Sequence, residues 1–172
     1  MNNNLLPQVW RFAILVLFQV LVLKQLTLSV GSYFNVLLYP LFIFLLPLRL
    51  SSVYTVLLGF AIGITVDTFY ATPGLHASAG AFSGYLRNLV VRLFGPRGGF
   101  SGKEPIFSPA YFGWQSFFQA IALFLLSHLL FYFLVSDFTF VYFSTVILKT
   151  IAALVLSLIF VVIYMAFFQA KE

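Results

Sequence analysis

Six apolar stretches, most of them about as long as a membrane span, dominate the 172-residue chain. A helix that crosses the hydrocarbon core of a bilayer needs about 20 apolar residues. The stretches therefore predict six spans in a single polytopic domain, residues 1–172, with five as the alternative count. They are Pro7–Leu28, Phe34–Leu48, Val53–Ala71, Leu75–Phe94, Trp114–Val135 and Thr139–Phe168. The second is short and carries Pro40 and Pro47, so we expect it to be kinked or tilted.

The overall composition supports a membrane protein. Hydrophobic residues make up 62% of the chain and charged residues 8%, whereas about a quarter of a soluble domain is charged. The fold class predicted is an all-α integral membrane bundle of about six helices. The first stretch has no basic residue before it and no small-residue cleavage site after it, so we expect a retained span. Cysteine is absent, which excludes disulfides and thiolate metal sites.

The positive charges are distributed unevenly between the two ends of the predicted spans. With the N-terminus in the cytoplasm, Lys24 falls outside, and the basic residues that fall inside are Arg11, Arg49, Arg92, Arg97, Lys103 and Lys171. Such asymmetry sets the orientation of membrane proteins, so it predicts both termini in the cytoplasm. It also explains the net charge of +5 without nucleic acid as a partner.

One polar stretch of appreciable length interrupts the spans, "GPRGGFSGKEPIFSPAYFG", residues 95–113. Its glycines and prolines predict a loop, on the cytoplasmic side by the charge argument. Together with Arg49 and Arg92, the loop residues Arg97 and Lys103 are candidates for contact with anionic lipid or a cytoplasmic partner.

Asp67 is an acid inside the third apolar stretch. Ionisable residues within spans are costly, usually face the bundle interior and are usually paired. The sequence leaves three partners open: His76 just after a short turn, Lys149 in the last span, and Arg87, which we expect to extend towards the cytoplasmic end. We favour His76. A proton or ion relay generally has several buried acids, so we interpret Asp67 as a residue that pins the third and fourth spans together.

Small residues support this interpretation. Gly59 and Gly63 form a G-x-x-x-G pattern on the third span, and Gly80 and Gly84 repeat it on the fourth. Spacing of four places each pair on one helix face, where the absence of side chains lets two helix backbones approach closely. The two patterns predict a tightly packed hairpin.

No motif predicts catalysis, a cofactor or a metal. The sequence has no nucleophile elbow and no acidic Mg²⁺ motif. His128 stands alone in an apolar span without a second ligand at metal-binding spacing, so we expect it to be hydrogen-bonded inside the bundle.

Residues 46–94, "LPLRLSSVYTVLLGFAIGITVDTFYATPGLHASAGAFSGYLRNLVVRLF", carry a family resemblance over under a third of the chain. The residues that match are Pro47, Arg49, Gly59, Phe60, Gly63, Asp67, Gly74, His76, Ala79, Tyr85 and Leu86. They resemble the bacterial rod shape-determining protein MreD family, and the glycine-rich loop is similar to that of Bacteroidetes-type members. The resemblance implies a fold similar to the substrate-binding S-components of energy-coupling-factor vitamin transporters.

The resemblance also implies a function. Members of the family are non-enzymatic subunits of the elongation machinery in the bacterial cytoplasmic membrane. Their partners are the bitopic protein MreC, the RodA glycosyltransferase with its penicillin-binding transpeptidase, and, directly or through other subunits, MreB filaments. Two alternatives stay open: a substrate-binding subunit of a vitamin-type transporter, and an ion-coupled carrier that uses Asp67 and Lys149.

Overall fold

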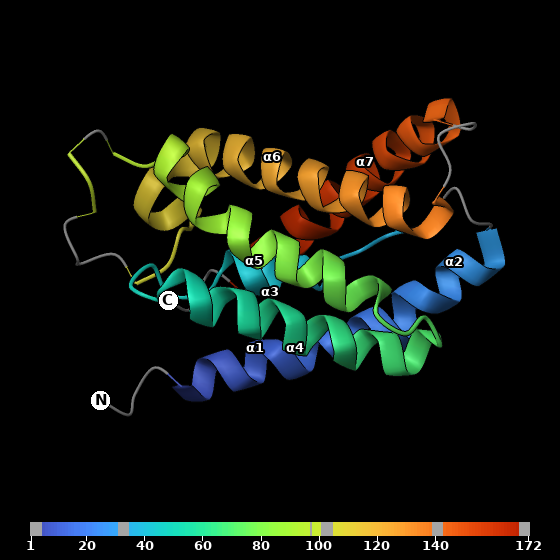
Figure 1. Cartoon of the computed structure of the whole chain (residues 1–172). Coiled ribbons are helices and arrows are strands. Elements are labelled where there is room, and N and C mark those ends of the chain that lie inside the picture. Colours follow the sequence, from blue (N-terminus) through green and yellow to red (C-terminus); the bar gives the residue numbers. More distant parts are fainter. Residues whose placement is uncertain (1–4, 31–34, 97, 101–104, 139–142, 169–172) are drawn as a thin grey trace.

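The computed structural model describes residues 5–30, 35–96, 98–100, 105–138 and 143–168, and within these ranges the fold is all-α. Figure 1 shows the helices packed into one bundle. In chain order they are α1 (Leu5–Phe18), the π-helix η1 (Gln19–Leu23), α2 (Lys24–Val30), α3 (Pro40–Phe44), α4 (Ser52–Tyr70), α5 (Leu75–Phe94), α6 (Pro109–Asp137) and α7 (Phe143–Phe168).

Four helices of the described ranges are long and apolar enough to cross a membrane: Pro7–Thr27, Ser52–Tyr70, Pro109–Asp137 and Phe143–Phe168. They confirm an all-α membrane bundle, although four is below the six spans expected from the sequence. The first of the four joins α1, η1 and most of α2 into one rod. α5 has 20 residues, but Arg87, Asn88 and Arg92 lower its hydropathy below that of the four.

The prediction of a second span over residues 34–48 is wrong for the residues that the structure describes. Its helical part is the five-residue α3, Pro40–Phe44, and residues 35–38 form no regular element. Pro40 fits the first turn of a helix but cannot continue one from residues before it, and Pro47 stops extension beyond it. We call residues 35–46 the α3 segment. It contacts α1, α4, α5 and α6, and every residue from Val36 to Leu46 is buried.

The two C-terminal spans are close to expectation, with a difference at the start of α6. α6 begins at Pro109, within the expected loop, and carries a break at Gly113, where φ is 78°. The described residues just before α6 belong to the core, since Phe107 and Ser108 are buried and the Pro105 carbonyl accepts a hydrogen bond from Leu48 N. This part of the predicted polar loop is therefore packed against the bundle.

Basic residues gather at one end of the bundle. Arg11 donates to the Leu45 carbonyl after α3, Arg49 lies just before α4, and Arg92 is in the last turn of α5. Because α4 and α5 are antiparallel, the start of one and the end of the other share this end (Figure 1). Lys24 lies at the opposite end, where its Nζ donates to the Phe69 carbonyl at 2.7 Å.

Candidate functional site

The α4–α5 hairpin is packed through glycines, and the two helix backbones are in contact. A Cβ atom added at Gly63 would lie 2.6 Å from Ala77 Cα, and one added at Gly84 would lie 2.7 Å from Val56 Cα. Gly59 and Gly80 face each other, with a Cβ on either one 2.9 Å from the carbonyl carbon of the other. Both predicted G-x-x-x-G faces therefore lie in one interface, where no side chain fits without a shift of backbone.

Asp67 caps the first turn of α5 from the last turn of α4. Its Oδ1 accepts from His76 N at 2.9 Å, and its Oδ2 accepts from Ala77 N at 2.9 Å and Gly74 N at 3.1 Å. The Thr72 hydroxyl adds a bond to Oδ1 at 3.0 Å. The first amides of a helix lack partners within it, and a negative charge is favourable there. The sequence did not reveal this capping role.

Of the three partners that the sequence left open for Asp67, the structure brings His76 to it. His76 Nδ1 lies 2.9 Å from Asp67 Oδ1, and both side chains are buried. Lys149 instead pairs with Asp137 at 2.9 Å, so the Asp67–Lys149 pair expected for an ion-coupled carrier is not formed. The Asp67–His76 contact joins the same two helices as the glycines.

Arg87 corrects a second expectation. We expected its side chain to extend towards the cytoplasmic end, but its exposed fraction is 0%. Its Nε donates to the Phe44 carbonyl at 3.3 Å, and its Nη2 donates to the Leu46 carbonyl. These carbonyls belong to the C-terminal end of the α3 segment, where a cation is favourable. Arg87 thus holds the α3 segment against α5.

Gln19 holds the other end of the α3 segment. Its Oε1 accepts from Leu38 N at 2.7 Å, and its Nε2 donates to the Val36 carbonyl at 3.0 Å. It is also the first residue of the π-helix η1, a feature that is often found at functional sites. The sequence analysis missed Gln19. The available signal was one amide side chain in the otherwise apolar run from Phe12 to Leu23 of the first span.

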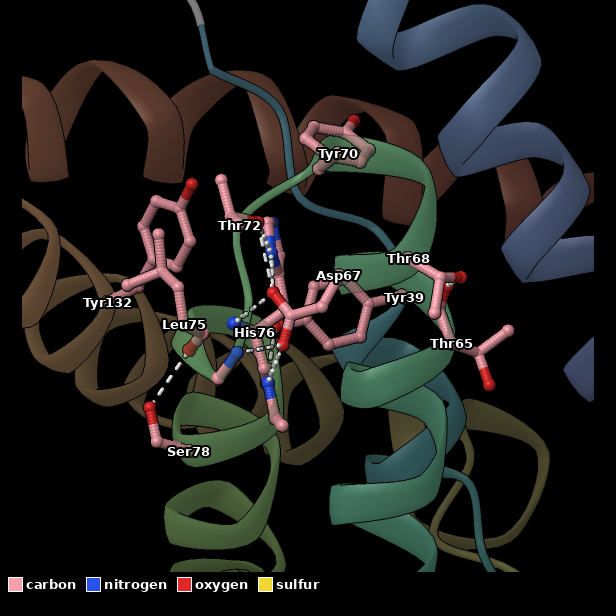
Figure 2. Close-up of polar contacts among 12 residues, drawn as sticks. Tyr39, Thr65, Asp67, Thr68, Tyr70, Thr72, Leu75, His76, Ser78 and Tyr132 are labelled. Carbon is pink, nitrogen blue, oxygen red and sulfur yellow. Dashed lines mark hydrogen bonds and ion pairs between the residues drawn. The ribbon is translucent and has the colours of Figure 1, made fainter.

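Three tyrosines surround the buried imidazole of His76. The ring centroids of Tyr70, Tyr132 and Tyr39 lie 4.9, 5.0 and 5.6 Å from that of His76. Figure 2 shows these rings around the Asp67–His76 pair. The rings come from α4, from α6 and from the residue just before α3, so this tyrosine cluster connects the hairpin to its neighbours.

A second buried histidine continues the polar cluster, and it is hydrogen-bonded inside the bundle, as the sequence predicted. His128 Nε2 lies 3.0 Å from the Tyr39 hydroxyl, and His128 Nδ1 lies 2.6 Å from Ser83 Oγ. Both ring nitrogens are therefore engaged. The part of the chain that the structure describes contains no group of three or more metal-binding side chains.

The structure describes two of the four residues predicted to make cytoplasmic contacts. Arg49 and Arg92 are exposed at one end of the bundle, whereas Arg97 and Lys103 lie outside the described residues. Arg49 and Arg92 are not part of the buried cluster around Asp67.

No family model, curated protein or solved structure matches the chain. The MreD resemblance and the likeness to transporter S-components therefore stay predictions. What the geometry supports is a rigid hairpin, closed by glycine contacts along its length and by a buried carboxylate at its turn.

Proposed function

We propose that the chain is a non-enzymatic membrane scaffold of the MreD type, which binds an MreC-like bitopic protein and helps couple the cytoskeleton to peptidoglycan synthesis. It would act in the bacterial cytoplasmic membrane with both termini inside, beside a RodA-type glycosyltransferase and its penicillin-binding transpeptidase. One observation carries the proposal. Four residues of the resembling pattern, Gly59, Gly63, Asp67 and His76, lie in the α4–α5 interface.

Other residues of the pattern point out of the bundle. The exposed fraction is 69% for Tyr85 and 46% for Phe60. Exposed aromatic side chains on a membrane helix are free to pack against lipid or against a partner helix, and aromatic residues are enriched at interfaces. A rigid hairpin that presents Phe60 and Tyr85 suits a scaffold for a single-span partner.

The test is an affinity pull-down from the native membrane in mild detergent, with partners identified by mass spectrometry. We expect an MreC-like protein and a wall synthase. Tyr85→Ala should lower the recovery of the MreC-like protein severalfold, because the substitution removes an exposed aromatic contact. Tyr54→Ala is the matched control, since Tyr54 is 61% exposed on α4 and lies outside the pattern. Equal recovery from both variants would count against Tyr85 and the pattern around it as the binding surface.

A second candidate function is a small-molecule binding subunit of a transporter. The observation that favours it is the buried cluster of His76, His128 and tyrosines near one end of the bundle. Pockets for small ligands combine aromatic walls with a few convergent polar groups. Recovery of paired ATPases with a large membrane coupling protein, in place of a wall synthase, would favour this function over the scaffold.

A further inference from the structure

Two buried acceptor atoms have no hydrogen-bond partner within the part of the chain that the structure describes. They are His76 Nε2 and Asn35 Oδ1. A buried polar atom that is left unsatisfied costs about 1–3 kcal/mol, so native structures rarely retain one without a reason.

The network around Asp67 assigns the protonation of His76. Asp67 accepts five hydrogen bonds in all, including one from the Thr72 hydroxyl and one from His76 Nδ1. An ionised carboxylate only accepts, so Nδ1 carries the imidazole proton. In the neutral ring the other nitrogen then has a lone pair, and Nε2 is an acceptor.

Tyr132 connects the two orphan acceptors. Its hydroxyl accepts from Asn35 Nδ2 at 3.4 Å, and its ring centroid lies 5.0 Å from that of His76. The hydroxyl keeps its own proton to donate. The two side chains that carry the unpartnered acceptors, His76 and Asn35, therefore both contact Tyr132, whose O–H is a donor. The rings of Tyr39 and Tyr70 also contact His76.

We infer that His76, Asn35 and Tyr132 form a binding site for a small molecule that donates two hydrogen bonds and accepts one. Water is the smallest molecule with this set, and buried waters typically make about three hydrogen bonds. A primary amine or primary amide of a small organic molecule offers the same groups. The site is independent of the scaffold function, and it adjoins the contact that caps α5. An occupant there stabilises the hairpin.

The test uses the full chain labelled with ¹⁵N-histidine and held in lipid nanodiscs. The ¹⁵N chemical shift of His76 Nε2 distinguishes a free lone pair, a lone pair that accepts a hydrogen bond, and a protonated nitrogen. We expect a lone pair that accepts a hydrogen bond. Tyr132→Phe removes the donor and keeps the ring, so it should move this signal towards the free lone-pair value. His128, whose nitrogens both have partners, is the internal control and should not move.

Native mass spectrometry of the same sample separates the two occupants. An accepting Nε2 without an added organic mass identifies water. An accepting Nε2 with an added mass that is lost in Tyr132→Phe identifies a small organic ligand. A free lone pair or a protonated Nε2 in the unmodified protein overturns the inference, and this result does not depend on whether any variant folds. Failure of the pull-down would not count against this binding site, because the measurement involves no partner protein.

Discussion

The α4–α5 hairpin and the α3 segment both place backbone polar groups inside an apolar bundle. The two regions differ in where the hydrogen-bond partners of these groups come from. In the hairpin, a carboxylate only seven to ten residues away in sequence accepts from Gly74, His76 and Ala77. In the α3 segment, partners come from distant elements: Gln19 from the first rod, Ser157 from α7 and Arg87 from α5. The hairpin is therefore locally determined, whereas the α3 segment depends on the assembled bundle.

This difference has a physical basis in membranes. Backbone groups in the hydrocarbon region must be satisfied internally, and irregular backbone is tolerated there only when protein or water covers it. The hairpin meets the requirement with regular helices and one cap. The α3 segment meets it because side chains of three neighbouring elements reach its backbone, as with Arg87 at the Phe44 carbonyl.

The largest effect should come from breaking the hairpin at its glycine contacts. Gly63→Leu forces α4 and α5 apart, because even a Cβ would lie 2.6 Å from Ala77 Cα, and we expect most of the folded protein to be lost. Size-exclusion recovery of monodisperse protein in detergent measures this. Gly98→Leu is the control, since no atom lies within 4 Å of a Cβ there. Equal recovery of the two variants would remove the packing argument.

Asp67→Asn should have the next largest effect on stability. The side-chain amide nitrogen of Asn is a donor and would face backbone N–H groups, which are donors too. The substitution also removes the negative charge that is favourable at the first turn of α5. Asp67 accepts several hydrogen bonds as an ionised group, and each hydrogen bond to a charged group contributes about 1.5–3 kcal/mol, so thermal unfolding in detergent would detect the loss. Asp137→Asn removes the partly exposed pair with Lys149 and should cost at most about 1 kcal/mol. Loss of solute uptake in Asp67→Asn, with assembly unchanged, would instead point to a carrier.

Arg87→Met tests the α3 segment. The substitution leaves the carbonyls of Phe44 and Leu46 without their donor, and hydrogen bonds of charged groups contribute about 1.5–3 kcal/mol. We expect a loss of stability of about 2–3 kcal/mol in the same thermal assay. Arg92→Met, on the exposed side of the same helix, should change stability little. If the two variants unfold alike, the α3 segment does not depend on Arg87.

Ser157→Ala should have the smallest effect. Ser157 Oγ accepts from Leu37 N at 3.2 Å across 120 residues of sequence, and loss of one such bond costs about 1 kcal/mol. Ser127→Ala is the control, because Ser127 donates to the Leu123 carbonyl of its own helix. A larger loss in Ser127→Ala than in Ser157→Ala would show that the long-range bond contributes nothing.

The contrast between local and distant hydrogen-bond partners also explains which features the sequence predicted. The glycine faces and the proximity of Asp67 to His76 follow from helical spacing and a short turn, so they were visible in one stretch of sequence. The capping of α5 by Asp67 was missed, although it is local, because a carboxylate within a span indicates pairing with a cation before it indicates amide capping. The proposed resemblance of residues 46–94 to the MreD family covers this same local unit.

The failures concern residues whose partners are distant. Apolar length alone predicted a second span at residues 34–48, but burial of the α3 segment depends on Gln19 and Arg87, whose contacts with it no local pattern reports. The expectation that Arg87 extends towards the cytoplasmic end failed for the same reason. The position of Lys149 was open because Asp137, its actual partner, lies at a helix end close to the next span.

The most direct measurement of how the hairpin is held is amide hydrogen exchange at His76 and Ala77, in the full chain and in Asp67→Ala, by NMR in nanodiscs. If the Asp67 carboxylate caps α5, both amides are protected in the unmodified protein and exchange at least tenfold faster in the variant. Gly59 and Gly80, in the middle of the interface, should change less. Unchanged protection of His76 and Ala77 in Asp67→Ala would contradict the capping role and, with it, the hairpin as a unit held by one buried acid.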